Sequence, residues 1–234
     1  MKKGFTLAEV LITLGIIGIV AALTMPVLIS SHQKKVAVAG LKKFYSTLSQ
    51  AKILAELENG EMDMWTFPNA KNLEEGEAFF NNYFKKHLNV ISQCKSIQEC
   101  NLYSASVPVY ILNDGTEFLF APNSSDSGLY GSYIYVKVDL NGNKRPNREG
   151  RDIFNLNIFP KTGVVMLGII DVINSNGDEH LVADRDTLKN GVKINGGRDI
   201  ACCNSTCSNT GYKYLTCGAL IQLDGWEMKD DYPW

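Results

Sequence analysis

The feature that most constrains this chain is an apolar run near its amino end, from Phe5 to Met25, which follows Lys2 and Lys3. As an α-helix with a rise of about 1.5 Å per residue, this run would be roughly 30 Å long, enough to cross the hydrocarbon core of a bilayer. Because basic residues beside a membrane helix favour the cytoplasmic side, we expect the two lysines there and everything after Met25 on the far side. The sequence therefore predicts a single-pass membrane anchor followed by an extracytoplasmic domain.

One acidic residue, Glu9, lies inside the apolar run. An acidic group at the centre of a membrane helix costs on the order of 2.5–3.5 kcal/mol of insertion free energy. An ionisable residue in such a span indicates a functional role, and the natural partner of a buried carboxylate is a cation supplied by another chain. We therefore predict that Glu9 takes part in assembly.

The segment Gly4-Phe5-Thr6-Leu7-Ala8-Glu9 closely resembles the amino-terminal signature of the type IV pilin and type II secretion pseudopilin family. The resemblance extends to Pro26, which stands where many pilins carry a helix-kinking proline. It implies that a prepilin peptidase cleaves after Gly4, on the cytoplasmic side, and that the new amino terminus on Phe5 is methylated. It also implies a partner for Glu9, the freed amine of Phe5 on a neighbouring subunit.

Two other interpretations of the same segment stay open. A secretory signal peptide also has a basic start and an apolar core, and residues 20–22 can serve as a small-residue cleavage site. An uncleaved anchor is the second alternative, although the length of the run and Glu9 favour the pilin signature. Amino-terminal sequencing separates the three, since the mature chain would begin at methylated Phe5, near Leu23, or at Met1.

After Pro26 the sequence becomes amphipathic, with apolar residues recurring at steps of three and four. This pattern predicts that the helix continues to Asn59-Gly60, with its first half in lipid or the filament core and its second half packed on the head. A second helix is predicted from Leu73 to Leu88, with Asn72 as its cap. The apolar face of the long helix consists of Ala37, Leu41, Phe44, Leu48, Ala51 and Ala55.

Further along the chain the pattern changes to that of strands. Val107–Leu112 and Thr116–Phe120 flank Asn113-Asp114-Gly115, which is typical of a β-hairpin because these turn residues accept positive φ. A long helix followed by antiparallel strands predicts an α+β, pilin-like fold in which the helix packs on a sheet. Further strands are predicted at Tyr133–Val138, Ile153–Phe159, Val164–Leu167 and Ala219–Leu223.

The six cysteines can pair as disulfides if the head lies outside the cytoplasm. Six cysteines allow 15 connectivities, and their close spacings favour Cys94 with Cys100 and the rest among themselves. The four later cysteines also cluster enough to consider zinc, but they lack paired C-x-x-C spacing. The residues concerned are Cys94, Cys100, Cys202, Cys203, Cys207 and Cys217.

The segment from Asp139 to Asp152 places oxygen-bearing side chains at alternate positions, as calcium ligands often are. It resembles the start of an EF-hand loop, but Gly150 stands where that loop requires glutamate. It also resembles a loop common in pseudopilin-like heads, some of which hold calcium. A tight turn closed by side-chain hydrogen bonds is the alternative. The predicted calcium ligands are Asp139, Asn141, Asn143 and Asp152.

Other functions find little support in the sequence. The formal net charge of −2 gives no basic field for nucleic acid, and no metalloprotease, serine-hydrolase or phosphate-loop motif is present. We therefore expect no enzymatic activity. The carboxy-terminal Trp226 and Trp234 are expected to pack as a tail, although an aromatic surface for a partner or glycan is an alternative.

These features predict a structural subunit, a minor pilin or a pseudopilin, of a type IV pilus or a type II secretion pseudopilus. Its expected partners are other pilin subunits, prepilin peptidase and the inner membrane, which holds the subunit before assembly. A membrane-anchored binding protein or hydrolase, using the same amino terminus only as an anchor, is the alternative. The expected parts are a leader at 1–4, a transmembrane and assembly helix at 5–29, and an extracytoplasmic head at 30–234.

Overall fold

A computed structural model describes residues 4, 6–68, 72–124, 132–172, 179–181, 184–194, 199–207 and 210–234. The chain forms two compact units, residues 1–36 and residues 37–234. Helix α1, Leu7–Asn59, is 53 residues long and contains Pro26. The prediction of one continuous helix across the apolar run and the amphipathic stretch is therefore confirmed.

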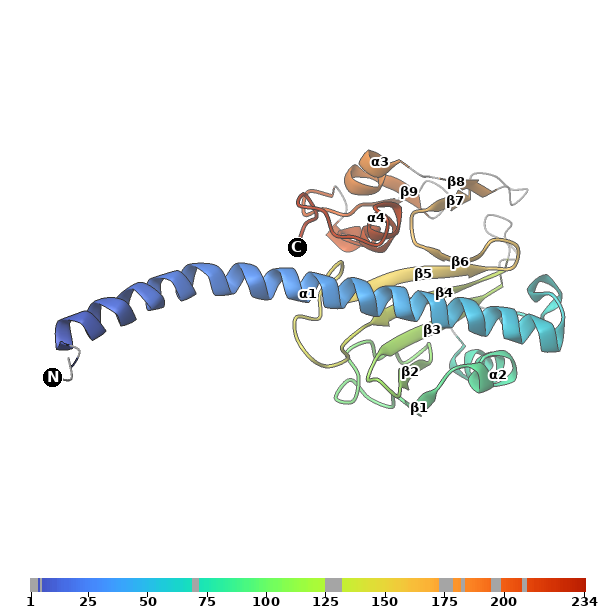
Figure 1. Cartoon of the computed structure of the whole chain (residues 1–234). Coiled ribbons are helices and arrows are strands. Elements are labelled where there is room, and N and C mark those ends of the chain that lie inside the picture. The colour runs from blue at the N-terminus through green and yellow to red at the C-terminus, as the bar shows by residue number, and fades with distance from the viewer. Residues whose placement is uncertain are drawn as a thin grey trace. The chain divides into compact units, whose positions relative to one another are not determined.

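The second unit is built on an antiparallel sheet of six strands in sequential order, β1-β2-β3-β4-β5-β6 (Figure 1). Each strand pairs with the next along the chain, and β3 and β4 share the longest register, from Glu117 opposite Asp139 to Asn123 opposite Tyr133. The α+β architecture predicted from the sequence is thus confirmed. The strands are Val90–Gln93, Val109–Leu112, Glu117–Asn123, Tyr133–Asp139, Ile153–Phe159 and Gly163–Met166.

One face of this sheet forms the core with the second half of α1 and with helix α2, Leu73–Tyr83. Phe44 of α1 lies 5.7 Å from Phe118 of β3, measured between ring centroids, and Phe80 of α2 stacks on Tyr110 of β2 at 3.9 Å. Burial of these rings and of Leu48, which is fully buried, removes a large apolar area from water and stabilises the fold.

The remaining elements follow the sheet. Helix α4, Cys217–Leu223, packs against β5 and β6. Short 3₁₀ helices lie at Met62–Met64, Lys85–His87 and Thr210–Tyr212. The other described elements are β7 (Ile170–Val172), β8 (Glu179–Leu181), α3 (Arg185–Asn190), β9 (Val192–Ile194) and β10 (Asp199–Ala201).

Two predicted elements differ from the structure. The segment Ala219–Leu223, predicted as a strand, lies in helix α4. The prediction was wrong because the residues from Cys217 to Ile221 are all buried, and a short buried run carries no period that separates a strand from a helix. The helix predicted from Leu73 to Leu88 ends at Tyr83 and continues as a 3₁₀ turn. Phe84, at the junction, is completely buried, so the change of helix type accompanies the turning of this ring into the core.

Candidate functional site

The amino-terminal end of α1 is organised by Thr6 and Glu9. The Thr6 side chain accepts a hydrogen bond from the Glu9 backbone N–H at 3.3 Å, and Glu9 Oε2 accepts from the Thr6 N–H and hydroxyl at 2.8 and 2.7 Å. This reciprocal arrangement is that of a capping box, which satisfies donors at the first turn of a helix. Glu9 is exposed, and no basic group of the described residues, which exclude Lys2 and Lys3, pairs with it.

The helix beyond Glu9 exposes its apolar side chains. Leu7, Leu14 and Leu23 are 80%, 60% and 72% exposed. An 18-residue window in α1 has a mean hydropathy of 2.4 with none of it buried, so the helix is long and apolar enough to cross a membrane. Exposed apolar surface of this extent indicates a lipid or protein environment outside the chain itself.

The predicted processing site adjoins this helix. Gly4 is exposed, and a Cβ added to it would meet no atom within 4 Å. Phe5, the predicted new amino terminus and methylation site, lies outside the described residues. Cleavage after Gly4 and methylation of Phe5 stay predictions.

Two of the predicted calcium ligands, Asp139 and Asp152, are buried carboxylates, and a third buried carboxylate, Glu117, lies near them. Asp139, Asp152 and Glu117 are 0%, 5% and 3% exposed. Burial raises the pKa of Asp139 to about 7, and the neighbouring charges of Asp152 and Glu117 add to the rise, although hydrogen bonds from Asn141 and Asn101 oppose it. The pKa of Glu117 is also raised by burial. Glu117 was not predicted as a site residue, since an acid at a buried strand position is not revealed by sequence spacing.

These carboxylates accept hydrogen bonds mainly from the backbone and from amide groups. Asp152 accepts from the N–H groups of Asn147 and Arg148 at 2.7 and 2.6 Å and from Asn141 Nδ2 at 3.0 Å. Asp139 accepts from the Asn141 N–H at 3.1 Å and from Asn101 Nδ2 at 2.9 Å. The turn proposed as the alternative to calcium is therefore present.

The structure brings three of the four predicted calcium ligands together. Asn141 joins Asp139 and Asp152, and its Oδ1 is buried without a hydrogen-bond partner. Asn143 instead donates to the backbone oxygen of Glu99 at 2.7 Å. Within the described part of the chain, no three His, Cys, Asp or Glu side chains are grouped to hold a metal ion. Calcium binding stays a prediction, with Asp139, Asn141 and Asp152 as the residues that would hold the ion.

All six cysteines form disulfides, and none is free. The pairs are Cys94 with Cys100, Cys202 with Cys207, and Cys203 with Cys217. This confirms the expectation of local pairing and chooses one connectivity among the later four. The zinc interpretation is wrong for this arrangement, because no thiolate is left to bind the ion.

The carboxy-terminal tail packs on the head. Trp226 lies 5.2 Å from Tyr45 between ring centroids, and the Arg151 guanidinium lies 5.3 Å from the Trp234 ring. Both tryptophans pack against the main core. The tail is fixed further by Arg185, which binds the carboxylates of Asp224 and Asp231.

Comparison with known proteins gives two matching family models. The model of the prokaryotic N-terminal methylation motif, the type IV pilin and pseudopilin signature, matches residues 1–25. The model of a family of unknown function (DUF6613) matches residues 27–234. Neither the curated proteins nor the solved structures gave a match. The amino-terminal resemblance is thereby confirmed, and it characterises a subunit of pilin or pseudopilin type.

Proposed function

This chain belongs to the family of unknown function DUF6613, and we propose that it is a minor pilin or pseudopilin. The proposal rests on the methylation motif that precedes the family's region in this chain. In this proposal the subunit is anchored in the inner membrane before assembly, with its amino terminus in the cytoplasm. It then enters a helical filament through the apolar part of α1. The head lies outside the cytoplasm, which is compatible with its disulfides.

The observation that carries the proposal is the isolation of Glu9. It is the only charged residue between Leu7 and Ser31, and no described basic group of its own chain pairs with it. In lipid or in a filament core, a carboxylate without a cation would cost several kcal/mol. The freed amine of Phe5 on a neighbouring subunit supplies that cation once the leader is removed.

Pairing of Glu9 with the neighbour's amine also sets the register between helices. A subunit docked at the wrong height leaves both charges unpaired in an apolar environment, whereas a correctly docked one satisfies both. The carboxylate therefore discriminates between dockings even if its net contribution to filament stability is small. Because Glu9 Oε2 already accepts from Thr6, the capping box holds the acid near the helix start.

The proposal is tested by mass spectrometry of the protein isolated from its native host. The expected species lacks residues 1–4 and carries a methyl group on Phe5. A protein that keeps the first four residues, or one that lacks the whole apolar segment, would contradict the proposal. The minor role is tested by quantifying the chain in purified filaments, where a substoichiometric amount is expected and an abundance equal to the main subunit is not.

A further inference from the structure

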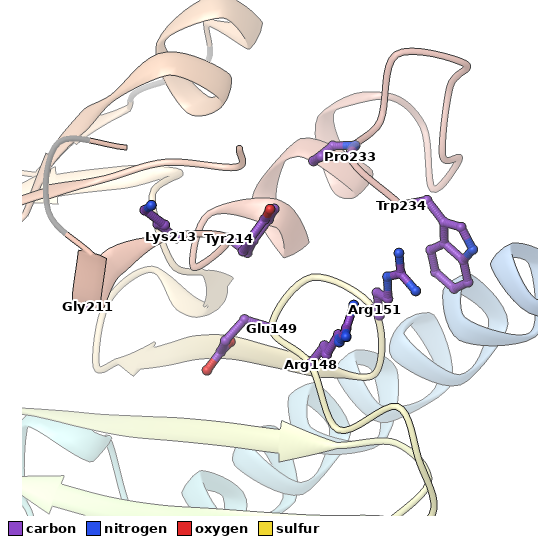
Figure 2. A pocket seen from close by; sticks show the side chains of 8 residues that line it. All are labelled: Arg148, Glu149, Arg151, Gly211, Lys213, Tyr214, Pro233 and Trp234. Atoms are coloured by element: carbon purple, nitrogen blue, oxygen red, sulfur yellow. The ribbon is translucent and has the colours of Figure 1, made fainter. Parts of the chain in front are cut away.

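A pocket of about 580 Å³ lies in the head between the loop after β4, the segment before α4 and the carboxy-terminal tail (Figure 2). Small-molecule sites commonly have volumes of about 300–1,000 Å³. In Figure 2, Lys213 and Tyr214 lie at one side of the pocket, and Arg151 and Trp234 at the other. The predicted assembly through α1 gives no role to this pocket.

The pocket is rich in positive charge. Arg148, Arg151 and Lys213 line it, whereas its one acid is Glu149. The Glu149 carboxylate is already paired with residues that do not line the pocket. Lys137 Nζ lies 2.5 Å from its Oε1, and Asn155 Nδ2 donates a hydrogen bond to its Oε2 at 2.8 Å. An anion entering the pocket would therefore meet cationic side chains and no uncompensated acidic side chain.

None of the three cations has an acidic side chain as a partner within the described residues. No acid there forms an ion pair with Arg148 or Lys213, and the Arg148 side chain is exposed. The guanidinium of Arg151, by contrast, lies 5.3 Å from the ring of Trp234. A guanidinium matches a carboxylate with two parallel hydrogen bonds, and an ammonium adds a third charged donor. Arg148 and Lys213 are thus the groups available to an anionic ligand.

The walls of the pocket are held together by contacts outside it. The Tyr232 hydroxyl donates to the Gly150 oxygen at 2.5 Å, which ties the tail to the loop that carries Arg148 and Arg151. Gly150 has φ +78°, and a Cβ placed on it would lie 2.9 Å from Cys217 Sγ. Since Cys217 is bonded to Cys203, the loop packs directly on a disulfide. Such preorganisation lowers the entropic cost of binding a ligand.

We propose that this pocket binds a small organic acid with a ring body, such as the acidic sugar at the end of a glycan. The ligand's anionic oxygens pair with Arg148 and Lys213, and its ring lies against the aromatic side chains of Tyr214 and Trp234. The flat face of an aromatic ring supplies apolar area, which suits the C–H face of a sugar ring. The inference concerns the head alone and goes beyond the proposed assembly role.

The test is a calorimetric titration of the full chain in detergent micelles, carried out separately with galacturonate, galactose and inorganic phosphate. Galacturonate is expected to bind saturably, at least about tenfold more tightly than either galactose, which lacks the charge, or phosphate, which lacks the ring. Arg148→Gln and Lys213→Gln are each expected to weaken galacturonate binding roughly tenfold, as loss of a charged hydrogen bond does. The matched control is Lys161→Gln at an exposed position in the β5–β6 turn, which should leave the affinity unchanged.

Three outcomes would overturn the proposal. One is the absence of saturable galacturonate binding, and another is equal affinity for galactose or phosphate. The third is unchanged galacturonate affinity in the Arg148→Gln, Lys213→Gln double variant. Thermal unfolding of each variant shows whether its fold is kept, which is expected because both substitutions leave the disulfides and the Tyr232 hydrogen bond in place.

Discussion

In the first part of α1, residues 7–29, leucine and isoleucine side chains are largely exposed, and the one acid has only Thr6 as a described partner. In the head, by contrast, apolar side chains such as Leu48 are fully buried. Some of its acids pair with cations of the chain as well, as Asp224 does with Arg185 and Lys229. The head thus buries a core and pairs part of its charge by itself, whereas the amino-terminal helix leaves both to other molecules.

From this difference we expect assembly to depend on the amino-terminal helix and the stability of the fold to depend on the head. Changes in the amino-terminal helix should act on anchoring and filament entry with little effect on the head. Changes in the head should act on its free energy of unfolding or on its ligands.

The largest effect is expected from Glu9→Leu, which removes the acid while keeping the helix apolar. If the acid pairs with a neighbour's amine, the variant should stay in the membrane and enter filaments at a small fraction of the parent level. Quantitative immunoblotting of sheared filaments and of membranes measures this partition. The matched control, Leu14→Ala, changes an exposed apolar residue of the same helix and should assemble much more fully; equal assembly of Glu9→Leu and the parent would refute the charge-pairing role.

The next largest effect is expected from Leu48→Ala in the second part of the same helix. Leu48 is completely buried, and truncation of a buried leucine lowers the free energy of unfolding by about 2–5 kcal/mol through lost burial and the cavity left behind. Thermal and denaturant unfolding of the full chain in detergent, followed by near-UV circular dichroism, measures this. Leu14→Ala should leave the unfolding of the head unchanged, and a comparable loss in that variant would show that the two parts are not energetically separate.

The parts of the fold that could be predicted from the sequence are those with a local signature. The long helix follows from an apolar run joined to a regular stripe, and the β2–β3 hairpin follows from Asn113-Asp114-Gly115. Helix α4 was missed because Cys217–Ile221 is buried throughout, so its sequence shows no exposed face. Strand β1 was missed because Ser92 and Gln93 give it little strand character.

The candidate sites show the same limit. Gly4 to Glu9 could be recognised because the motif is contiguous. Glu117, however, becomes a neighbour of Asp139 only through pairing of β3 with β4, and the pocket joins Arg148 to Lys213 and Trp234 from distant segments. Such groupings depend on tertiary structure, which local spacing does not encode.

The third prediction concerns Asp139, whose charge lacks a cation among the described residues although its oxygens accept hydrogen bonds. Because burial raises its pKa from 3.8 to about 7, the folded state favours the protonated form. Its contribution to stability is fully present below about pH 4 and is lost as the pH rises to about 7, with a slope of at most about 1.4 kcal/mol per pH unit. Urea unfolding from pH 4 to 8 should therefore show a smaller decline in Asp139→Asn than in the parent.

Two further measurements test the origin of that pH dependence. Asp230→Asn, at an exposed position of the tail, is the control and should keep the parent's profile; parallel profiles for Asp139→Asn and the parent would contradict the assignment. Calcium, if it binds as the sequence predicts, should raise the thermal midpoint of the parent, and this rise should vanish in Asp139→Ala.

The smallest effect is expected from Arg185→Met, which tests whether the head neutralises its own acids. The side chain of Asp224 is 3% exposed and lies 2.9 Å from Arg185 Nε. Burial alone would raise the pKa of Asp224, but hydrogen bonds from Arg185 and Lys229 outweigh it and lower the pKa. The stability from this pairing is therefore present above about pH 4 and lost as the pH falls further. The variant should lose about 1–2 kcal/mol of unfolding free energy at pH 7, because Lys229 still compensates part of the charge.

The deficit of Arg185→Met should shrink as the pH falls below 4, because the unfolded chain then binds protons at Asp224 and Asp231, whereas pairing with Arg185 lowers the pKa of both acids in the folded parent. Arg145→Met, at an exposed position, controls for the loss of one positive charge and should cost less than about 0.5 kcal/mol. A deficit that stays constant from pH 7 to 3 would show that Arg185 acts through packing of its aliphatic stem. In that case the acids of the tail would not be neutralised in the way that distinguishes the head from the amino-terminal helix.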